Sequence, residues 1–216
     1  MFTVKKHQQG FTLVEIAIVL VIIGLLLGGV LKGQELIYNQ KVKSTYDNYR
    51  QYTAAMYGYQ DRYKALPGDD PNATTRGFIV PAGQPAITAG NGNGFIDGGN
   101  NQCLTPVITP TLEVCQANYH LRLSGFITGQ GTMSAQHPLG GVVTLNATAG
   151  TGMPAAFVAP TAVCWHGLPN KAAQQIDVSY DDGSATSGSM QGSASYTTLL
   201  VTLPDTASAA WTCMSN

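Results

Sequence analysis

The most pronounced pattern in the chain is an unbroken apolar run near its N-terminus. Residues 16–31 read Ile-Ala-Ile-Val-Leu-Val-Ile-Ile-Gly-Leu-Leu-Leu-Gly-Gly-Val-Leu, and a single acid, Glu15, stands just before them. With the residues that precede it, this segment is long enough to cross a bilayer core, which needs about 20 apolar residues. A carboxylate inside such a segment is rare and usually has a partner. The pattern therefore predicts a membrane-spanning helix with one functional acid near its start.

Beyond residue 31 the pattern stays helical but becomes amphipathic. Apolar and aromatic residues recur at steps of three and four, as expected for one face of a helix: Val42, Tyr46, Tyr49, Tyr52, Met56, Tyr59 and Tyr63. The opposite face is polar: Lys41, Lys43, Asp47, Asn48, Arg50, Gln51, Asp61 and Arg62. Since no proline interrupts residues 11–63, we expect one long helix whose second half packs on a core.

The rest of the chain is predicted to be less regular and largely β. Leu66-Pro67-Gly68 should end the long helix, because proline disfavours helix at the preceding residue and Pro-Gly forms turns. An irregular stretch follows, and then a short helix is expected over 112–123. Strands are expected over 141–146, 175–180 and 197–203, which are β-branched and bounded by turn residues. The Gly/Ser-rich segment 184–195 is expected to be a surface loop.

Composition and charge limit the choice of partners. The 216 residues suit one domain plus the N-terminal segment. The net charge of -1 is unevenly distributed, with eight Lys+Arg and four Asp+Glu in residues 1–64, and three and eight in residues 65–216. Arg76, Arg122 and Lys171 are the only cations after residue 64. We expect no nucleic-acid partner, because phosphate binding needs several cations.

The cysteines indicate an oxidising compartment. All four follow the apolar run, and an even number in that position suggests two disulfides. None has CxxC spacing, so a zinc site is not expected. Four cysteines allow three pairings. We favour Cys103–Cys115, which closes a short loop, together with Cys164–Cys213, which ties the C-terminus to the body.

The most specific motif is Gly10-Phe11-Thr12-Leu13-Val14-Glu15, with Lys5 and Lys6 before it and the apolar run after it. This combination resembles the prepilin signature of type IV pilins and type II secretion pseudopilins. The resemblance implies that a membrane peptidase cuts after Gly10 and methylates the new N-terminus, Phe11. It also implies that the Glu15 carboxylate neutralises the N-terminal ammonium of Phe11 on a neighbouring subunit during assembly.

A secretory signal peptide is the alternative interpretation of this segment. Its small-residue cleavage site would follow the apolar run, and no convincing A-x-A site follows Leu31. We therefore expect the mature protein to keep its anchor. Lys5 and Lys6 favour a cytoplasmic N-terminus. The remainder of the chain would then lie in the periplasm, and after assembly in an extracellular pilus or a periplasmic pseudopilus.

The resemblance also implies an organisation and a function. The expected fold is α+β and type IV pilin-like, with a long N-terminal helix on an antiparallel β-sheet and a disulfide-closed C-terminal region. We expect a leader (1–10), a transmembrane and filament-core half-helix (11–31), an amphipathic half-helix (32–65) and a globular head (66–216). The expected function is that of a structural subunit of a type IV pilus-like filament. Its partners would be copies of itself or related pilins, the prepilin peptidase and an inner-membrane assembly platform.

Three alternatives to a pilus subunit were weighed. Two lie close to it: a type II secretion pseudopilin, and a minor tip pilin with an adhesive or binding role. The third, a membrane-tethered enzyme, is disfavoured because the sequence has no G-x-S-x-G, P-loop or H-E-x-x-H motif. His7 falls in the leader. The other histidines, His120, His137 and His166, are expected to be surface or structural residues.

The segment Gly90-Asn91-Gly92-Asn93-Gly94-Phe95-Ile96-Asp97 resembles part of a calcium-binding loop. Alternating Asn and Asp oxygens around a glycine turn are typical of such loops, which makes Asn91, Asn93 and Asp97 weak candidate ligands. However, Ala89 stands where an EF-hand needs its first Asp, and Asn100 replaces the bidentate Glu. Asp69 or Asp70 could supply charge from elsewhere. We favour a turn without metal and expect no cofactor, with calcium as the alternative.

Overall fold

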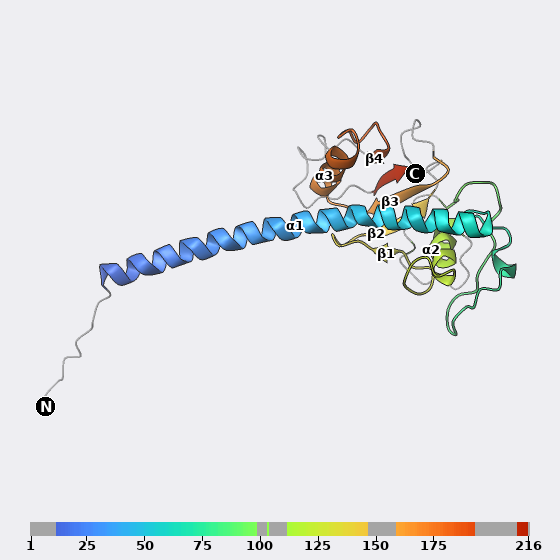
Figure 1. Cartoon of the computed structure of the whole chain (residues 1–216), viewed down its shortest axis with the longest axis horizontal. Helices are drawn as coiled ribbons and strands as arrows, with labels where there is room; N and C mark the ends of the chain where they lie inside the picture. The colour runs from blue at the N-terminus through green and yellow to red at the C-terminus, as the bar shows by residue number, and fades with distance from the viewer. Residues whose placement is uncertain (1–11, 99–102, 104–111, 147–158, 193–210, 216) are drawn as a thin grey trace, which may run out of the picture. The chain divides into compact units, whose positions relative to one another are not determined.

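The computed structural model describes residues 12–98, 103, 112–146, 159–192 and 211–215. The chain divides into two compact units, residues 1–40 and residues 41–216, which are taken separately below. The helix α1, Leu13–Tyr63, supplies the described part of the first unit and the beginning of the second (Figure 1). The predicted long N-terminal helix is thus confirmed, and the sheet and disulfides described below complete an α+β, pilin-like fold.

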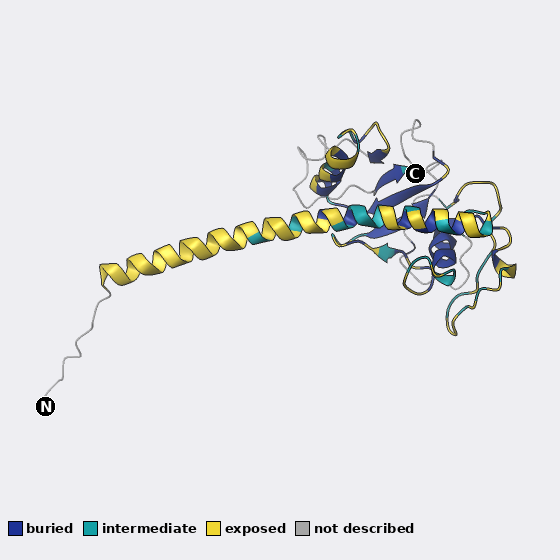
Figure 2. Ribbon diagram, in the orientation of Figure 1, coloured by how far each residue is buried: buried dark blue, intermediate teal, exposed yellow. Residues whose placement is uncertain are grey.

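In the first unit, α1 has no apolar face directed at a core. Every residue from 12 to 32 is exposed, as Figure 2 shows. Its most apolar 18-residue window has a mean hydropathy of 2.8 and no buried residue. Among the described residues, α1 is the one helix long and apolar enough to cross a membrane. Such a surface is stable only against lipid or other apolar surface.

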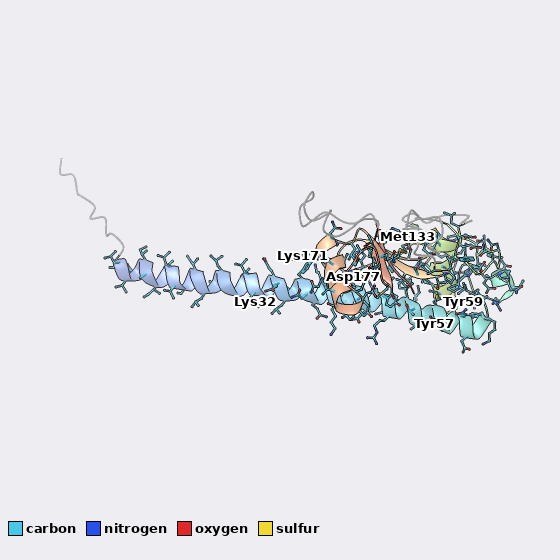
Figure 3. All side chains as sticks on the ribbon, turned by 90° about the horizontal axis from the view of Figure 1, so that it is seen from above. Lys32, Tyr57, Tyr59, Met133, Lys171 and Asp177 are labelled. Atoms are coloured by element: carbon cyan, nitrogen blue, oxygen red, sulfur yellow. A yellow bond between two sulfur atoms is a disulfide. The ribbon has the colours of Figure 1, made fainter. Side chains whose placement is uncertain are left out.

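In the second unit, α1 buries the predicted face. Its buried residues are Val42, Thr45, Tyr52, Ala55, Met56 and Tyr59. Tyr59 is fully buried while Tyr57, two residues earlier, is 51% exposed, and Figure 3 labels both. Tyr49 packs against Trp165 with ring centroids 6.3 Å apart, and its hydroxyl donates to the carbonyl of Ser215 at 2.9 Å. The aromatic stripe is therefore a packing surface, as the periodicity predicted.

The sheet that α1 covers is antiparallel and has five strands in the order β1-β2-β3-β5-β4. The strands are β1 Ala135–Gln136, β2 Val142–Asn146, β3 Ala162–His166, β4 Met190–Gly192 and β5 Trp211–Ser215. The central strands β2 and β3 are buried at every residue, which their β-branched and apolar composition permits. The expected strand over 141–146 is confirmed by β2. The strand expected over 197–203 lies outside the described residues.

Two further helices belong to the second unit, with a 3-10 turn, η1 Ala73–Thr75, before them. The helix α2, Glu113–Leu123, confirms the predicted short helix. The helix α3, Asn170–Tyr180, shows that the strand predicted over 175–180 was wrong. Ile176, Val178 and Tyr180 do alternate, but Val178 is 64% exposed. The buried residues of α3 are Asn170, Ala172, Ala173, Ile176 and Asp177. That spacing is helical, so a short alternation had been mistaken for the true period.

Two disulfides join parts of the second unit, Cys103–Cys115 and Cys164–Cys213. This is the pairing favoured from the sequence. Cys164 and Cys213 face each other across β3 and β5, while Trp165 points to the face of the sheet that carries Tyr49. Since side chains alternate along a strand, the second disulfide lies on the other face of the sheet. Its two sulfurs are buried with Ala162.

Removing the two disulfides one at a time should affect stability unequally. The Cys164–Cys213 bridge closes a loop with a sequence separation of 49, against 12 for Cys103–Cys115. We expect the double variant Cys164→Ala/Cys213→Ala to lose about 2–4 kcal/mol of unfolding free energy, and Cys103→Ala/Cys115→Ala about 1 kcal/mol less. Urea unfolding of the full chain in detergent, followed by circular dichroism, measures both. An equal or larger loss from the shorter loop would contradict the loop-closure argument.

An ion-pair network fixes the loop that follows α1. Arg76 donates to both carboxylate oxygens of Asp70, from Nε at 2.6 Å and from Nη2 at 2.9 Å, and Nη2 also donates to the carbonyl of Tyr63 at 2.9 Å. The Tyr59 hydroxyl donates to Asp70 at 2.8 Å. Asp70 is fully buried, so these donors offset the cost of removing its charge from water. The network holds the adjacent Asp69 in position.

Candidate functional site

The start of α1 is closed by a reciprocal capping arrangement between Thr12 and Glu15. The Thr12 backbone N–H and hydroxyl both donate to Glu15 Oε2, at 2.8 and 2.9 Å, and the Glu15 N–H donates to Thr12 Oγ1 at 3.3 Å. These bonds form a capping box, in which an N-cap Thr and a Glu three residues later satisfy free N–H groups. No capping role was predicted for Glu15, although Thr-x-x-Glu before an apolar run is the usual signal of a capping box.

Glu15 remains the one ionisable residue between Phe11 and Leu31. Gly10 and Phe11, the predicted cleavage and methylation residues, lie outside the described residues. Glu15 itself is exposed in the first turn of α1, with Ile16, Ile18 and Val19 beside it. The arrangement therefore presents one carboxylate at the rim of a long apolar surface, where it can accept bonds from its own helix or meet a cation of another molecule.

The glycine-asparagine loop, residues 90–97, is built around the carboxylate of Asp69. Asp69 Oδ1 accepts from the backbone N–H groups of Gly92 at 2.6 Å and Asn93 at 3.1 Å, and Oδ2 accepts from Gly94 at 2.7 Å. Of the two acids considered for this position, Asp69 thus folds across the loop, while Asp70 pairs with Arg76. A side chain at Gly90 would collide with the backbone of Asp69, so the close approach needs glycine here.

The three weak candidate ligands do lie together in this loop. Asp97 Oδ2 accepts from Asn91 Nδ2 at 3.0 Å and from Asn93 Nδ2 at 2.7 Å. The side-chain oxygens of Asn91 and Asn93 accept from backbone N–H groups of their own loop, at 2.9 and 2.8 Å. Amide nitrogens, which cannot bind a cation, therefore face the carboxylate. In this arrangement the set is satisfied by hydrogen bonds within the chain.

Glu113, at the start of α2, completes the loop. Its two carboxylate oxygens accept from the backbone N–H groups of Asn91 and Asp97, each at 2.8 Å. Burial raises the pKa of the Glu113 carboxyl above its ordinary value, and the negative charges of Asp69 and Asp97 act in the same direction. Three carboxylates thus converge on one loop, and backbone and amide N–H groups separate them.

A second acidic cluster was not predicted from the sequence, where the residues after 175–180 were considered only as turn residues. The carboxylates of Asp177, Asp181 and Asp182 offer oxygen atoms within 4.8 Å of one another, and Figure 3 labels Asp177 on α3. Each carboxylate already accepts hydrogen bonds from this turn: Asp177 from Gly183 N at 2.9 Å, Asp181 from Met190 N at 2.7 Å, and Asp182 from Ser184 N at 2.9 Å. The cluster organises the loop between α3 and β4.

The histidines after the leader are structural and buried, which is one of the two roles expected for them. His120 Nδ1 accepts from the Gly68 N–H at 3.0 Å, and Nε2 donates to the carbonyl of Thr88 at 3.1 Å. His137 is held in a similar way by the Leu139 N–H and the carbonyl of His166. Burial lowers the pKa of His120 and of His166 to about 4. The neutral imidazole of His120 thereby joins α2 to the loops at Gly68 and Thr88.

Comparison with known proteins gives a match at the N-terminal end of the chain. A family model described as a prokaryotic N-terminal methylation motif matches residues 5–31. This motif is the hallmark of type IV pilins and pseudopilins, which are structural rather than catalytic proteins, so the resemblance seen in the sequence is confirmed. The motif implies a substrate of prepilin peptidase that assembles as pilins do, and with the apolar helix it fits inner-membrane anchoring. No curated protein and no solved structure matches the chain.

Proposed function

We propose that this protein is a structural subunit of a type IV pilus-like filament. It is stored in the inner membrane through residues 11–31, with the head, residues 66–216, in the periplasm. After cleavage between Gly10 and Phe11, it leaves the membrane and its apolar helix becomes part of the filament core. Residues 32–65 connect this helix to the head, and the part from residue 41 onward packs against it.

The observation that carries the proposal is the first half of α1. An apolar helical surface with every side chain from residue 12 to 32 exposed needs an apolar partner throughout the life of the protein. Lipid provides that partner before assembly, and the equivalent helices of other subunits can provide it afterwards. The methylation motif over residues 5–31 supports this use of the helix.

Filament localisation tests the proposal. Cells that express the chain are sheared, and the released filaments are labelled with antibodies raised against the head. Labelling along the length of surface filaments is the expected result. Labelling of the tip alone would indicate a minor pilin with a binding role, and assembly confined to the periplasm would indicate a secretion pseudopilin. A protein that stays monomeric in the membrane under all conditions would contradict the proposal.

Processing at the Gly10–Phe11 bond is the second expectation. Mass spectrometry of mature protein should give a chain that begins at Phe11 and carries one added methyl group. The matched control is Gly10→Val, which places a β-branched side chain at the cleavage position and should accumulate as the uncleaved form. A mature wild-type chain beginning at Met1, or beyond Leu31, would remove the basis of the proposed assembly.

A further inference from the structure

The two acidic loops of the second unit share a chemical feature that the assembly proposal does not use. The described residues of these loops contain four Asn-Gly or Asp-Gly bonds whose first residue is exposed: Asn91–Gly92, Asn93–Gly94, Asp97–Gly98 and Asp182–Gly183. Such bonds are prone to damage because glycine lacks the side chain that would hinder its nitrogen. The glycine nitrogen attacks Cγ of the preceding residue and loses its proton, while ammonia leaves Asn or water leaves Asp. Water then opens the resulting succinimide to aspartate or isoaspartate.

In three of these four bonds, those at Asn91, Asn93 and Asp182, the glycine N–H that would attack donates to a carboxylate of another residue. Asp69 accepts from the Gly92 N–H at 2.6 Å and from the Gly94 N–H at 2.7 Å. Asp177 accepts from the Gly183 N–H at 2.9 Å. Both acceptors are buried, with exposed fractions of 4% for Asp69 and 0% for Asp177. The loops are separate in sequence and use different acids, so the same arrangement occurs twice.

The groups under attack are held as well. Asp97 accepts from the side-chain amides of Asn91 and Asn93, whose nitrogens would depart as ammonia. The Asp182 carboxylate accepts from Ser184 N at 2.9 Å and from Ser187 Oγ at 2.7 Å. For succinimide to form, the glycine nitrogen must turn away from its carboxylate and the attacked side chain must leave its own partners.

We propose that Asp69 and Asp177 protect these three bonds from deamidation and isomerisation, Asp69 at Asn91 and Asn93, and Asp177 at Asp182. Hydrogen bonds to a charged acceptor are the stronger kind. Breaking one before the reaction should slow it by about tenfold or more. The inference does not depend on filament assembly, although durable loops suit a subunit that is not replaced once it is polymerised.

The experiment follows the damage at each bond in the full chain in detergent, at mildly alkaline pH for Asn91 and Asn93 and at mildly acidic pH for Asp182, whose carboxyl must be protonated for water to leave. Peptide mass spectrometry measures conversion of Asn91 and Asn93, and an isoaspartate assay on the peptide that contains Asp182 measures isomerisation there. Wild type, unfolded and reduced in denaturant, provides the unprotected rate. At all three bonds, the rate in folded wild type should be at least about tenfold lower than the rate in the unfolded chain.

Two variants act as controls for each other. Asp69→Asn should accelerate the reactions at Asn91 and Asn93 while leaving Asp182 slow, and Asp177→Asn should do the reverse. Circular dichroism and intact disulfides establish that each variant is folded. If either variant unfolds, amide hydrogen exchange is measured in wild type instead. The backbone amides of Gly92, Gly94 and Gly183 should then exchange more slowly than most amides of these loops. Unchanged rates in folded variants, equal rates in folded and unfolded wild type, or fast exchange at these glycines would overturn the proposal.

Discussion

Replacing Glu15 with glutamine should reduce incorporation into filaments by about a hundredfold, while insertion in the membrane and cleavage continue. In the proposed assembly, the ammonium of Phe11 from one subunit enters an apolar core beside Glu15 of another. Breaking such a pair by removing one partner leaves an uncompensated buried charge, and the cost corresponds to two or more powers of ten. Western blots of inner-membrane and sheared filament fractions, compared between variant and wild type, measure the effect.

The capping box makes this experiment more specific than an alanine substitution would be. Glutamine can replace glutamate in a capping box, so Glu15→Gln keeps the bond pattern with Thr12 and removes only the charge. Thr12→Ala is the matched control, because it breaks the box and retains the carboxylate. We expect Thr12→Ala to assemble. If Glu15→Gln assembles like wild type and Thr12→Ala does not, Glu15 serves its own helix and assembly depends on apolar packing alone.

The sequence predicts an element well when its hydrophobic pattern is long or when turn residues flank it. The aromatic stripe from Val42 to Tyr59 repeats over five turns, so the burial of this helical face follows from periodicity. The strand β2 was predicted because Val142, Val143 and Leu145 lie between turn residues. The helix α3 was not predicted, because six residues are too few to distinguish the alternation of a strand from one face of a helix. The helix-forming residues Lys171 to Gln174 lie just outside the six residues that were considered.

The candidate sites show a similar division. The methylation motif is local in sequence, so residues 5–31 could be recognised directly. The role of Asp69 could only be raised as an option, because Asp69 and Gly92 are 23 residues apart and no local pattern states which of two adjacent acids will turn inward. The structure supplies the reason: Arg76 and Tyr59 bind Asp70, and its neighbour is thereby directed to the loop. Such long-range pairing depends on the whole fold.

Acid should destabilise the second unit through its buried histidines. Burial lowers the pKa of His120 from 6.5 to about 4, and its surroundings include Asp70, which opposes this shift, and Arg76, which adds to it. In the folded protein, Nδ1 must stay unprotonated to accept from Gly68 N–H. In the unfolded chain the imidazole takes up a proton near its ordinary pKa. Between these two values the unfolded state binds more protons, so stability falls as pH falls.

The size of this effect can be isolated at one residue. The shift in the pKa of His120 corresponds to about 3 kcal/mol of unfolding free energy, present at neutral pH and lost by about pH 4. Glu113 acts in the opposite direction, since burial raises the pKa of its carboxyl. Asp70 titrates below this window: burial alone would raise the pKa of its carboxyl, but hydrogen bonds from Arg76 and Tyr59 lower it overall. The net slope therefore depends chiefly on the buried histidines.

His120→Gln provides the test, because glutamine can accept from Gly68 and donate to Thr88 without titrating. We expect the variant to lose some stability at neutral pH, since its geometry is less suited to both bonds. Between neutral pH and about pH 4, however, its unfolding free energy should fall by about 3 kcal/mol less than that of wild type. Urea unfolding at a series of pH values gives both slopes. Equal slopes would mean that His120 is protonated, or solvated, in the folded protein, and the bond from the Gly68 N–H to its ring would then have to be abandoned.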